Sequence, residues 1–167
     1  MTDELILIVE DNDKNRKLVR DVLTFKGYEV IETETGEEGV QLARERRPSL
    51  VLMDIRLPGI DGVEALRRLR AEETTRGISV MAMTASVMSE DRQKIMAAGF
   101  DAYQSKPINV TDFVAAVAQL LEHRRARARR RQSQSKWPRC FQAVAAVQVA
   151  IVAPLSGGTA HDRQESM

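Results

Sequence analysis

The chain alternates short apolar blocks with longer amphipathic segments, and this alternation restricts the fold more than any other feature. Four blocks have strand length and a fifth is weaker: residues 5–9, 28–31, 50–53, 78–82 and 102–104. The first and third are apolar without a break, which is typical of strands covered on both faces. Five strand-then-helix units in succession predict an α/β fold, with a parallel sheet and helices on both of its faces.

The segments between the blocks carry helix start and stop signals. Residues 13–25 place apolar side chains on one helical face, and Gly27 follows as a stop signal. Residues 35–38 have the sequence of a capping box, which opens a helix that we expect to run through Ala43. Further helix starts are expected at Asp61, Ser89 and Asn109.

Charge divides the chain into an acidic front and a basic back. Residues 1–122 carry 16 basic and 22 acidic side chains, whereas residues 123–167 carry 9 and 2. We therefore expect a folded domain over residues 1–122. A basic linker or extension of the last helix follows over 123–136, and an Ala/Val-rich tail of unknown structure over 137–167. A single cysteine and an acidic start without a signal-peptide pattern favour a cytoplasmic protein.

The arginine run at residues 124–131 has three interpretations. It could contact nucleic-acid phosphates or an anionic membrane surface, or it could be a solvated basic extension. The third is favoured, because no base-reading motif accompanies the run.

Polar residues follow four of the apolar blocks, and in open α/β sheets ligands bind beyond the carboxyl ends of the strands. These residues are Glu10 and Asp11, then Asp54, then Thr84, and finally Ser105, Lys106 and Pro107. Singly, each is explained as a helix cap, a turn residue or a solvated charge. Together they place three carboxylates at one edge, which is costly unless a cation lies among them. Oxygen ligands of this kind suit Mg²⁺, so the pattern predicts a hard-metal site beside an anion site.

The same motifs resemble the receiver domain of two-component response regulators, most closely the single-domain, chemotaxis-regulator-like type. The resemblance covers residues 4–122 and rests on Glu10-Asp11, the segment 53–62 around Asp54, Thr84-Ala85, Tyr103 and Lys106-Pro107. It implies a flavodoxin-like, doubly wound five-stranded parallel sheet in the order 2-1-3-4-5.

The resemblance also implies a role for each site residue. Asp54 would accept a phosphoryl group from a histidine kinase or a histidine phosphotransfer protein. Lys106 would stabilise the anionic transition state, and the Thr84 hydroxyl would donate to a phosphoryl oxygen. Mg²⁺ would be held by Glu10 (through water), Asp11, Asp54 and the backbone carbonyl of Arg56. The Lys106–Pro107 peptide would be cis.

The expected output is a change of shape passed to a downstream protein target. Thr84 moving toward the phosphoryl group would make room for Tyr103 to turn inward, which would alter the surface over residues 89–121. Tyr103 could instead be a half-buried strand residue with no switching role. The Arg56 side chain could shield the phosphoryl group, pair with Glu10 or point into solvent.

Three other functions compete with a phosphorylated receiver. A pseudo-receiver would bind proteins without being phosphorylated, but it has no need of clustered like charge. An aspartyl phosphatase would need a second carboxylate two residues after its nucleophile, where this chain has Arg56. A nucleic-acid binder would use the basic tail. We therefore expect a stand-alone regulator or phosphorelay intermediate, which catalyses only its own phosphorylation and dephosphorylation and is no conventional enzyme.

Overall fold

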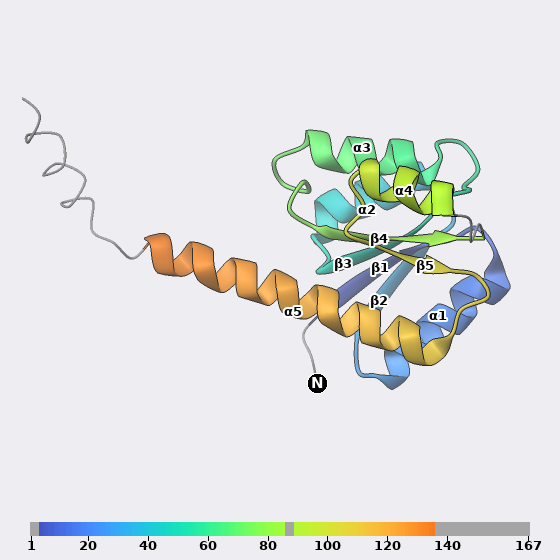
Figure 1. The fold of residues 1–167 in the computed structure, drawn as a ribbon, viewed down its shortest axis with the longest axis horizontal. Helices are drawn as coiled ribbons and strands as arrows, with labels where there is room; N and C mark the ends of the chain where they lie inside the picture. The colour runs from blue at the N-terminus through green and yellow to red at the C-terminus, as the bar shows by residue number, and fades with distance from the viewer. Residues whose placement is uncertain (1–3, 86–88, 136–167) are drawn as a thin grey trace, which may run out of the picture. The chain divides into compact units, whose positions relative to one another are not determined.

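The computed structural model describes residues 4–85 and 89–135, in which strands and helices alternate along the chain (Figure 1). The strands are β1 (Leu5–Val9), β2 (Glu29–Thr33), β3 (Leu50–Asp54), β4 (Ser79–Thr84) and β5 (Ala102–Ser105). The helices are α1 (Asp13–Phe25), α2 (Gly36–Arg46), α3 (Gly62–Ala71), α4 (Ser89–Ala97) and α5 (Val110–Ser135). All strand pairs are parallel and the order is β2-β1-β3-β4-β5, so the predicted doubly wound sheet is confirmed.

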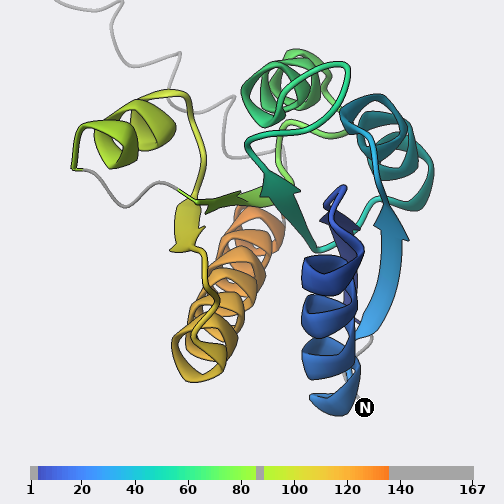
Figure 2. The same cartoon turned by 90° about the vertical axis from the view of Figure 1, so that its right-hand side faces the viewer.

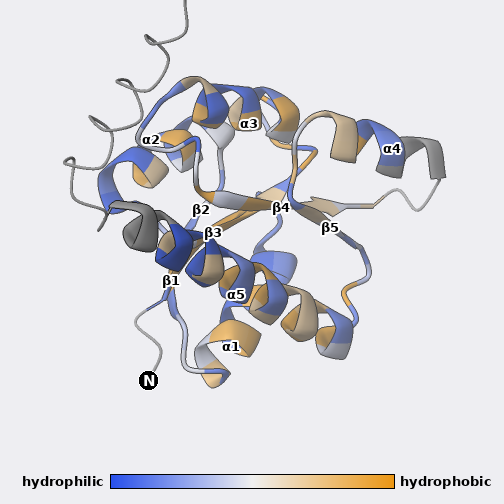
Figure 3. Ribbon diagram, turned by 60° about the vertical axis from the view of Figure 1, so that its left-hand side comes forward, coloured by the Kyte–Doolittle hydropathy of each residue, from blue (hydrophilic) through white to orange (hydrophobic). Residues whose placement is uncertain are grey.

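The two faces of the sheet bury two separate hydrophobic clusters. In β1, Ile6 and Ile8 belong to the cluster under α1 and α5, whereas Leu7 and Val9 belong to the cluster under α2, α3 and α4. Figure 2 shows the two helical layers on opposite sides of the strands, and Figure 3 shows apolar residues in the strands and on stripes of the helices. The unbroken apolar runs of the sequence are thus explained, because successive side chains enter different cores.

Side-chain caps start the helices where the sequence predicts them. The carboxamide of Asn12 accepts hydrogen bonds from the backbone amides of Lys14 and Asn15, which begins α1. Thr35 caps α2 by accepting from the amide of Glu38 at 3.3 Å. The Glu38 carboxylate does not complete the expected capping box. It accepts instead from the hydroxyl of Thr33, so that it ties α2 to the end of β2.

Helix α5 runs past the end of the expected domain, to Ser135. The described residues up to Ala128 form one compact unit, and the described residues after Ala128 are helical. The Ala/Val-rich segment 137–167 lies outside the described residues. Among the described helices, none combines the length and apolar character needed to cross a membrane.

Candidate functional site

The predicted site residues meet at the carboxyl edge of the sheet. Asp54 and Thr84 are the last residues of β3 and β4, while Glu10 and Lys106 directly follow β1 and β5. The amide of Lys106 donates to the carbonyl of Thr84 at 2.7 Å, which fixes the start of the β5–α5 loop beside the end of β4. The Lys106–Pro107 peptide bond is cis.

A largely buried lysine bridges two buried carboxylates at this edge. The Nζ atom of Lys106 lies 2.6 Å from Oδ2 of Asp54 and 2.7 Å from Oε2 of Glu10. The side chains of Lys106, Asp54 and Glu10 are only 15%, 8% and 0% exposed. Charges this well shielded from water interact more strongly than surface pairs, so the three groups form one electrostatic unit.

The carboxylates outnumber the ammonium group. Glu10, Asp11 and the nearby Asp54 each offer an oxygen, and these oxygens lie within 4.8 Å of one another. Oε2 of Glu10 is buried and accepts no hydrogen bond of good geometry from the described residues, although the Lys106 ammonium is close. Three carboxylates that share one ammonium offer the oxygen ligands that suit a hard divalent cation such as Mg²⁺.

The electrostatics of the site appear in two pKa values. Burial, reinforced by repulsion from Asp54, raises the pKa of the Glu10 carboxyl, and the Lys106 ammonium offsets this only in part. Burial lowers the pKa of the Lys106 ammonium, but its hydrogen bond to Asp54 and the attraction of the Asp54 and Glu10 carboxylates outweigh this, so the net direction is upward. The site therefore stabilises the charged form of Lys106 and destabilises the charged form of Glu10.

The β3–α3 loop orients the Asp54 carboxylate. The backbone amide of Arg56 donates to Oδ1 of Asp54 at 3.1 Å, leaving Oδ2 to Lys106. Gly62 is required behind the loop, because a Cβ atom at this position would lie 2.3 Å from the carbonyl oxygen of Asp54. Gly62 therefore packs directly against the backbone of Asp54.

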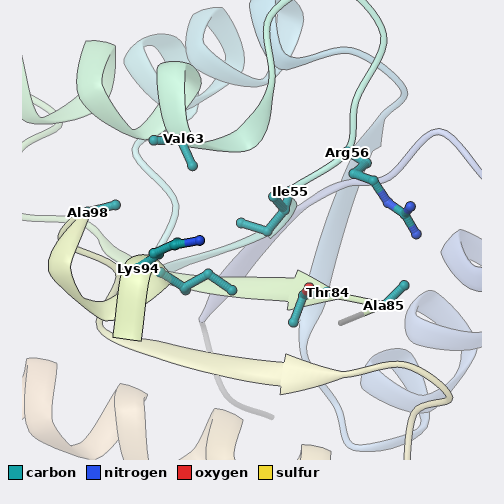
Figure 4. A pocket seen from close by; sticks show the side chains of 8 residues that line it. Ile55, Arg56, Val63, Thr84, Ala85, Lys94 and Ala98 are labelled. Atoms are coloured by element: carbon teal, nitrogen blue, oxygen red, sulfur yellow. The ribbon is translucent and has the colours of Figure 1, made fainter. Parts of the chain in front are cut away.

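A cavity of about 510 Å³ opens beside the site, with Thr84 at one end and Val63 and Ala98 across from it (Figure 4). Lys94 and Arg56 also line the cavity. Figure 4 shows the guanidinium of Arg56 directed away from Lys94. The Arg56 side chain is exposed and makes no ion pair with Glu10 within the described part of the chain. The buried Thr84 therefore lines a cavity between the described residues.

Tyr103 is half-buried on β5 and packs against the cluster under α2, α3 and α4. It is paired in register with Ala82, and Thr84 is paired with Ser105. Since side chains two residues apart on a strand share a face, Tyr103 lies on the same face of the sheet as Thr84, one step back along the strands.

Three residues of the site were missed by the sequence analysis. Oε1 of Glu10 accepts from the amide of Asn12 and from Nδ2 of Asn15, both at 3.3 Å. The guanidinium of Arg16 donates to the carbonyl oxygen of Glu10 at 2.8 Å. For the two asparagines the signal was available, since Asn12 and Asn15 are three residues apart and such a spacing shares one helical face.

Fold and site together define a class of protein: a doubly wound α/β domain with a carboxylate cluster and a lysine at the carboxyl edge of its sheet. Residues 6–118 match the family described as the response regulator receiver domain. The polar-differentiation response regulator DivK of Brucella anthropi is 45% identical over 116 residues, which are 70% of this chain and 94% of DivK. The chain belongs to the response regulator receiver family.

Solved structures agree with this assignment. The receiver domain of the sensor histidine kinase PA1611 from Pseudomonas aeruginosa PAO1, with a magnesium ion coordinated in its active site cleft, superposes with a TM-score of 0.68. It is 32% identical, and the match covers 72% of this chain and 99% of that domain. A CheY-like receiver domain protein from Methanospirillum hungatei JF-1 also has a TM-score of 0.68, at 29% identity over 75% of this chain and 99% of that one.

Proposed function

We propose that this receiver accepts a phosphoryl group on Asp54 from the phosphohistidine of a histidine kinase or a histidine phosphotransfer protein. A carboxylate oxygen of Asp54 forms the new bond to phosphorus, and the phosphorus–nitrogen bond to the donor imidazole breaks, with its electron pair leaving on the imidazole nitrogen. The observation that carries the proposal is the buried Lys106 ammonium, 2.6 Å from Asp54 and 2.7 Å from Glu10. A charge held in place beforehand stabilises the anionic transition state without reorganisation.

The neighbours of Asp54 have separate tasks in this proposal. The amide of Arg56 holds one oxygen of Asp54 and keeps the carboxylate oriented. Thr84 ends the adjacent strand, from where its hydroxyl would donate to a phosphoryl oxygen. Lys106 would keep its charge throughout, because its hydrogen bond to Asp54 and the attraction of Asp54 and Glu10 raise the pKa of its ammonium.

We further propose that Glu10, Asp11, Asp54 and the backbone carbonyl of Arg56 hold Mg²⁺, with Glu10 acting through water. The excess of carboxylate oxygens over the single ammonium supports this, as does the magnesium ion in the related Pseudomonas domain. Bound there, Mg²⁺ would supply positive charge that offsets the negative charge of the carboxylates and of the phosphoryl group.

The proposed output is a switch of packing between Thr84 and Tyr103. A phosphoryl group adds up to about −2 charge and three acceptor oxygens, which would draw the Thr84 hydroxyl toward Asp54. Tyr103 shares the face of Thr84, and the cavity beside Thr84 leaves room for rearrangement. The surface of α4, β5 and α5 would then change the affinity for a downstream protein target.

We propose that residues 1–122 are the working domain and that the basic segment 123–136 and the tail 137–167 are appendages. A cytoplasmic location would give the domain access to phosphohistidine donors, whose phosphoryl groups come from ATP. Phosphorylation and dephosphorylation of its own Asp54 would be the only catalysis. The second candidate is a pseudo-receiver, which binds proteins without being phosphorylated. The carboxylate cluster argues against it, because a binding module has no need of three carboxylates that share one lysine.

The test is intact-mass spectrometry of the full chain after incubation with acetyl phosphate and Mg²⁺. The wild type should gain about 80 Da, the mass of one phosphoryl group. Asp54→Asn should gain nothing, whereas Asp21→Asn, an exposed aspartate on α1, should behave as the wild type. An adduct on Asp54→Asn would place the phosphoryl group elsewhere, and a folded wild type without an adduct would favour the pseudo-receiver.

A further inference from the structure

Arg16 is a buried cation that the proposed phosphorylation chemistry does not use. It lies in the first turn of α1, directly behind the acid pair, and its side chain is only 11% exposed. Arginine is almost never buried without partners, because removing the guanidinium from water is costly. Its partners therefore show what the burial achieves.

The guanidinium of Arg16 joins two loops of the carboxyl edge. Nη1 donates to the carbonyl oxygen of Glu10 at 2.8 Å, in the β1–α1 loop. Nη2 donates to Oε1 of Glu34 at 2.9 Å, in the β2–α2 loop, and also to the carboxylate of Asp13. A planar guanidinium satisfies such separated acceptors at once, which the single ammonium of a lysine does less well.

Asn15, the residue before Arg16, binds the side chain of Glu10. Nδ2 of Asn15 and the amide of Asn12 both donate to Oε1 of Glu10, at 3.3 Å. The start of α1 therefore fixes Glu10 twice, by its backbone through Arg16 and by one carboxylate oxygen through Asn15. The other oxygen, Oε2, is left facing Lys106 and the carboxylate cluster.

We propose that Arg16 is a positioning residue for Mg²⁺ binding, acting through the backbone of Glu10. By holding the Glu10 carbonyl it sets the direction in which the β1–α1 loop presents the carboxylates of Glu10 and Asp11. Mg²⁺ demands near-ideal octahedral geometry, so a small displacement of these oxygens weakens binding. The inference rests on the proposed function, since it concerns the same carboxylates.

The test measures Mg²⁺ binding directly, by isothermal titration calorimetry on the full chain, with urea unfolding without metal as a second measurement. Arg16→Gln should raise the Mg²⁺ dissociation constant about 10-fold, the typical lower effect of removing an outer-shell partner. Arg16→Lys should rescue part of this loss. The matched control is Arg20→Gln, one turn further along α1, where an arginine 41% exposed pairs with Glu32 on β2 at 3.0 Å. Arg20→Gln should leave Mg²⁺ affinity unchanged.

Phosphorylation by acetyl phosphate separates positioning from a purely structural role. In Arg16→Gln the Mg²⁺ concentration for half-maximal rate should rise with the dissociation constant, while the rate at saturating Mg²⁺ stays close to that of the wild type. A variant that is less stable toward urea but binds Mg²⁺ as the wild type does would overturn the inference and make Arg16 structural only. If Arg16→Gln does not fold, Glu34→Gln neutralises one of the acceptors of Arg16 and should still weaken Mg²⁺ binding about twofold to threefold. Unchanged affinity there overturns the inference as well.

The two proposals fail differently. A wild type that binds no Mg²⁺ and gains no phosphoryl group contradicts the proposed function. A wild type that does both, with an Arg16→Gln variant of equal affinity, contradicts only the role of Arg16.

Discussion

Strand β1 is bracketed by two buried glutamates in opposite electrostatic surroundings. Glu4 directly precedes the strand and is 8% exposed, and Glu10 directly follows it and is 0% exposed. Both are charged side chains withdrawn from water at an end of the same strand. They differ in the balance of charge around them. Two arginines pair with Glu4, whereas Glu10 shares one lysine with Asp54.

Glu4 lies between two arginines of α5. Nε of Arg125 donates to Oε1 at 2.7 Å, and Nη1 of Arg124 lies 3.4 Å from Oε2 and 3.0 Å from the hydroxyl of Ser49. Burial alone would raise the pKa of Glu4, but hydrogen bonds from Ser49 and Arg125 and the attraction of both arginines lower it overall. The Glu4 cluster thus favours the charged carboxylate and fastens α5 to the sheet.

Glu10 shares a single lysine with Asp54, and Asp11 adds a third carboxylate nearby. Its pKa is raised where that of Glu4 is lowered. The difference shows that burial of a charge does not by itself distinguish a functional cluster from a structural one. The sign of the net charge distinguishes them. The Glu4 cluster has more cations than carboxylates, whereas the Glu10 cluster has more carboxylates than cations.

The largest expected effect comes from removing the Lys106 ammonium, which lies 2.7 Å from Glu10. Lys106→Met should lower the free energy of unfolding by about 3 kcal/mol at neutral pH without divalent cations, because it leaves buried carboxylates without their counter-charge. Urea unfolding measures this. Added Mg²⁺ should stabilise the variant more than the wild type, since no ammonium competes for the carboxylates.

Lys17→Met, on the exposed surface of α1, is the control and should change stability by less than about 0.5 kcal/mol. Equal stabilities of Lys106→Met and the wild type would show that the carboxylates need no counter-charge.

The next effect tests the Glu4 cluster. Glu4→Gln should lower the free energy of unfolding by about 2 kcal/mol, because Arg124 and Arg125 lose a partly buried, charge-assisted acceptor. The control is Glu29→Gln, an exposed glutamate beside Leu5 in the sheet register, whose loss should have little effect. A Glu4→Gln variant as stable as the wild type would show that the Glu4 cluster does not contribute to stability.

The sequence predicted the elements and the composition of the acid site, but not the contacts that hold them. The strand blocks, the helix starts and the order of the sheet follow from periodicity and from the family resemblance, and they are confirmed. The role of Glu4 could not be predicted, because its partner Arg125 is 121 residues away in the chain. Arg16 was missed for another reason: the acceptor that it holds is a backbone carbonyl, which a pattern of side chains does not reveal.

A smaller effect of opposite sign is expected at the other end of β1. Glu10→Gln should raise the free energy of unfolding by about 1 kcal/mol in the absence of metal, because it removes a buried charge that Asp54 repels. Glu45→Gln, an exposed glutamate of α2, serves as the control. Destabilisation by Glu10→Gln would mean that the bond to Lys106 outweighs burial and repulsion, contrary to the direction of the pKa.

The smallest effect is the pH dependence of these two differences in stability. The folded-state pKa of Glu10 lies above its ordinary value of 4.5, so its charge opposes folding at neutral pH. This penalty is relieved as the pH falls through the folded-state pKa, and the advantage of Glu10→Gln should shrink before about pH 4.5. Glu4 has a lowered pKa, so its contribution is complete above 4.5 and is lost only as the pH falls through the folded-state value. Urea unfolding of both variants and the wild type, in EDTA from neutral pH down to pH 4.5, should therefore show the Glu10→Gln difference narrowing while the Glu4→Gln difference persists. Parallel behaviour of the two would mean that both glutamates experience the same balance of charge.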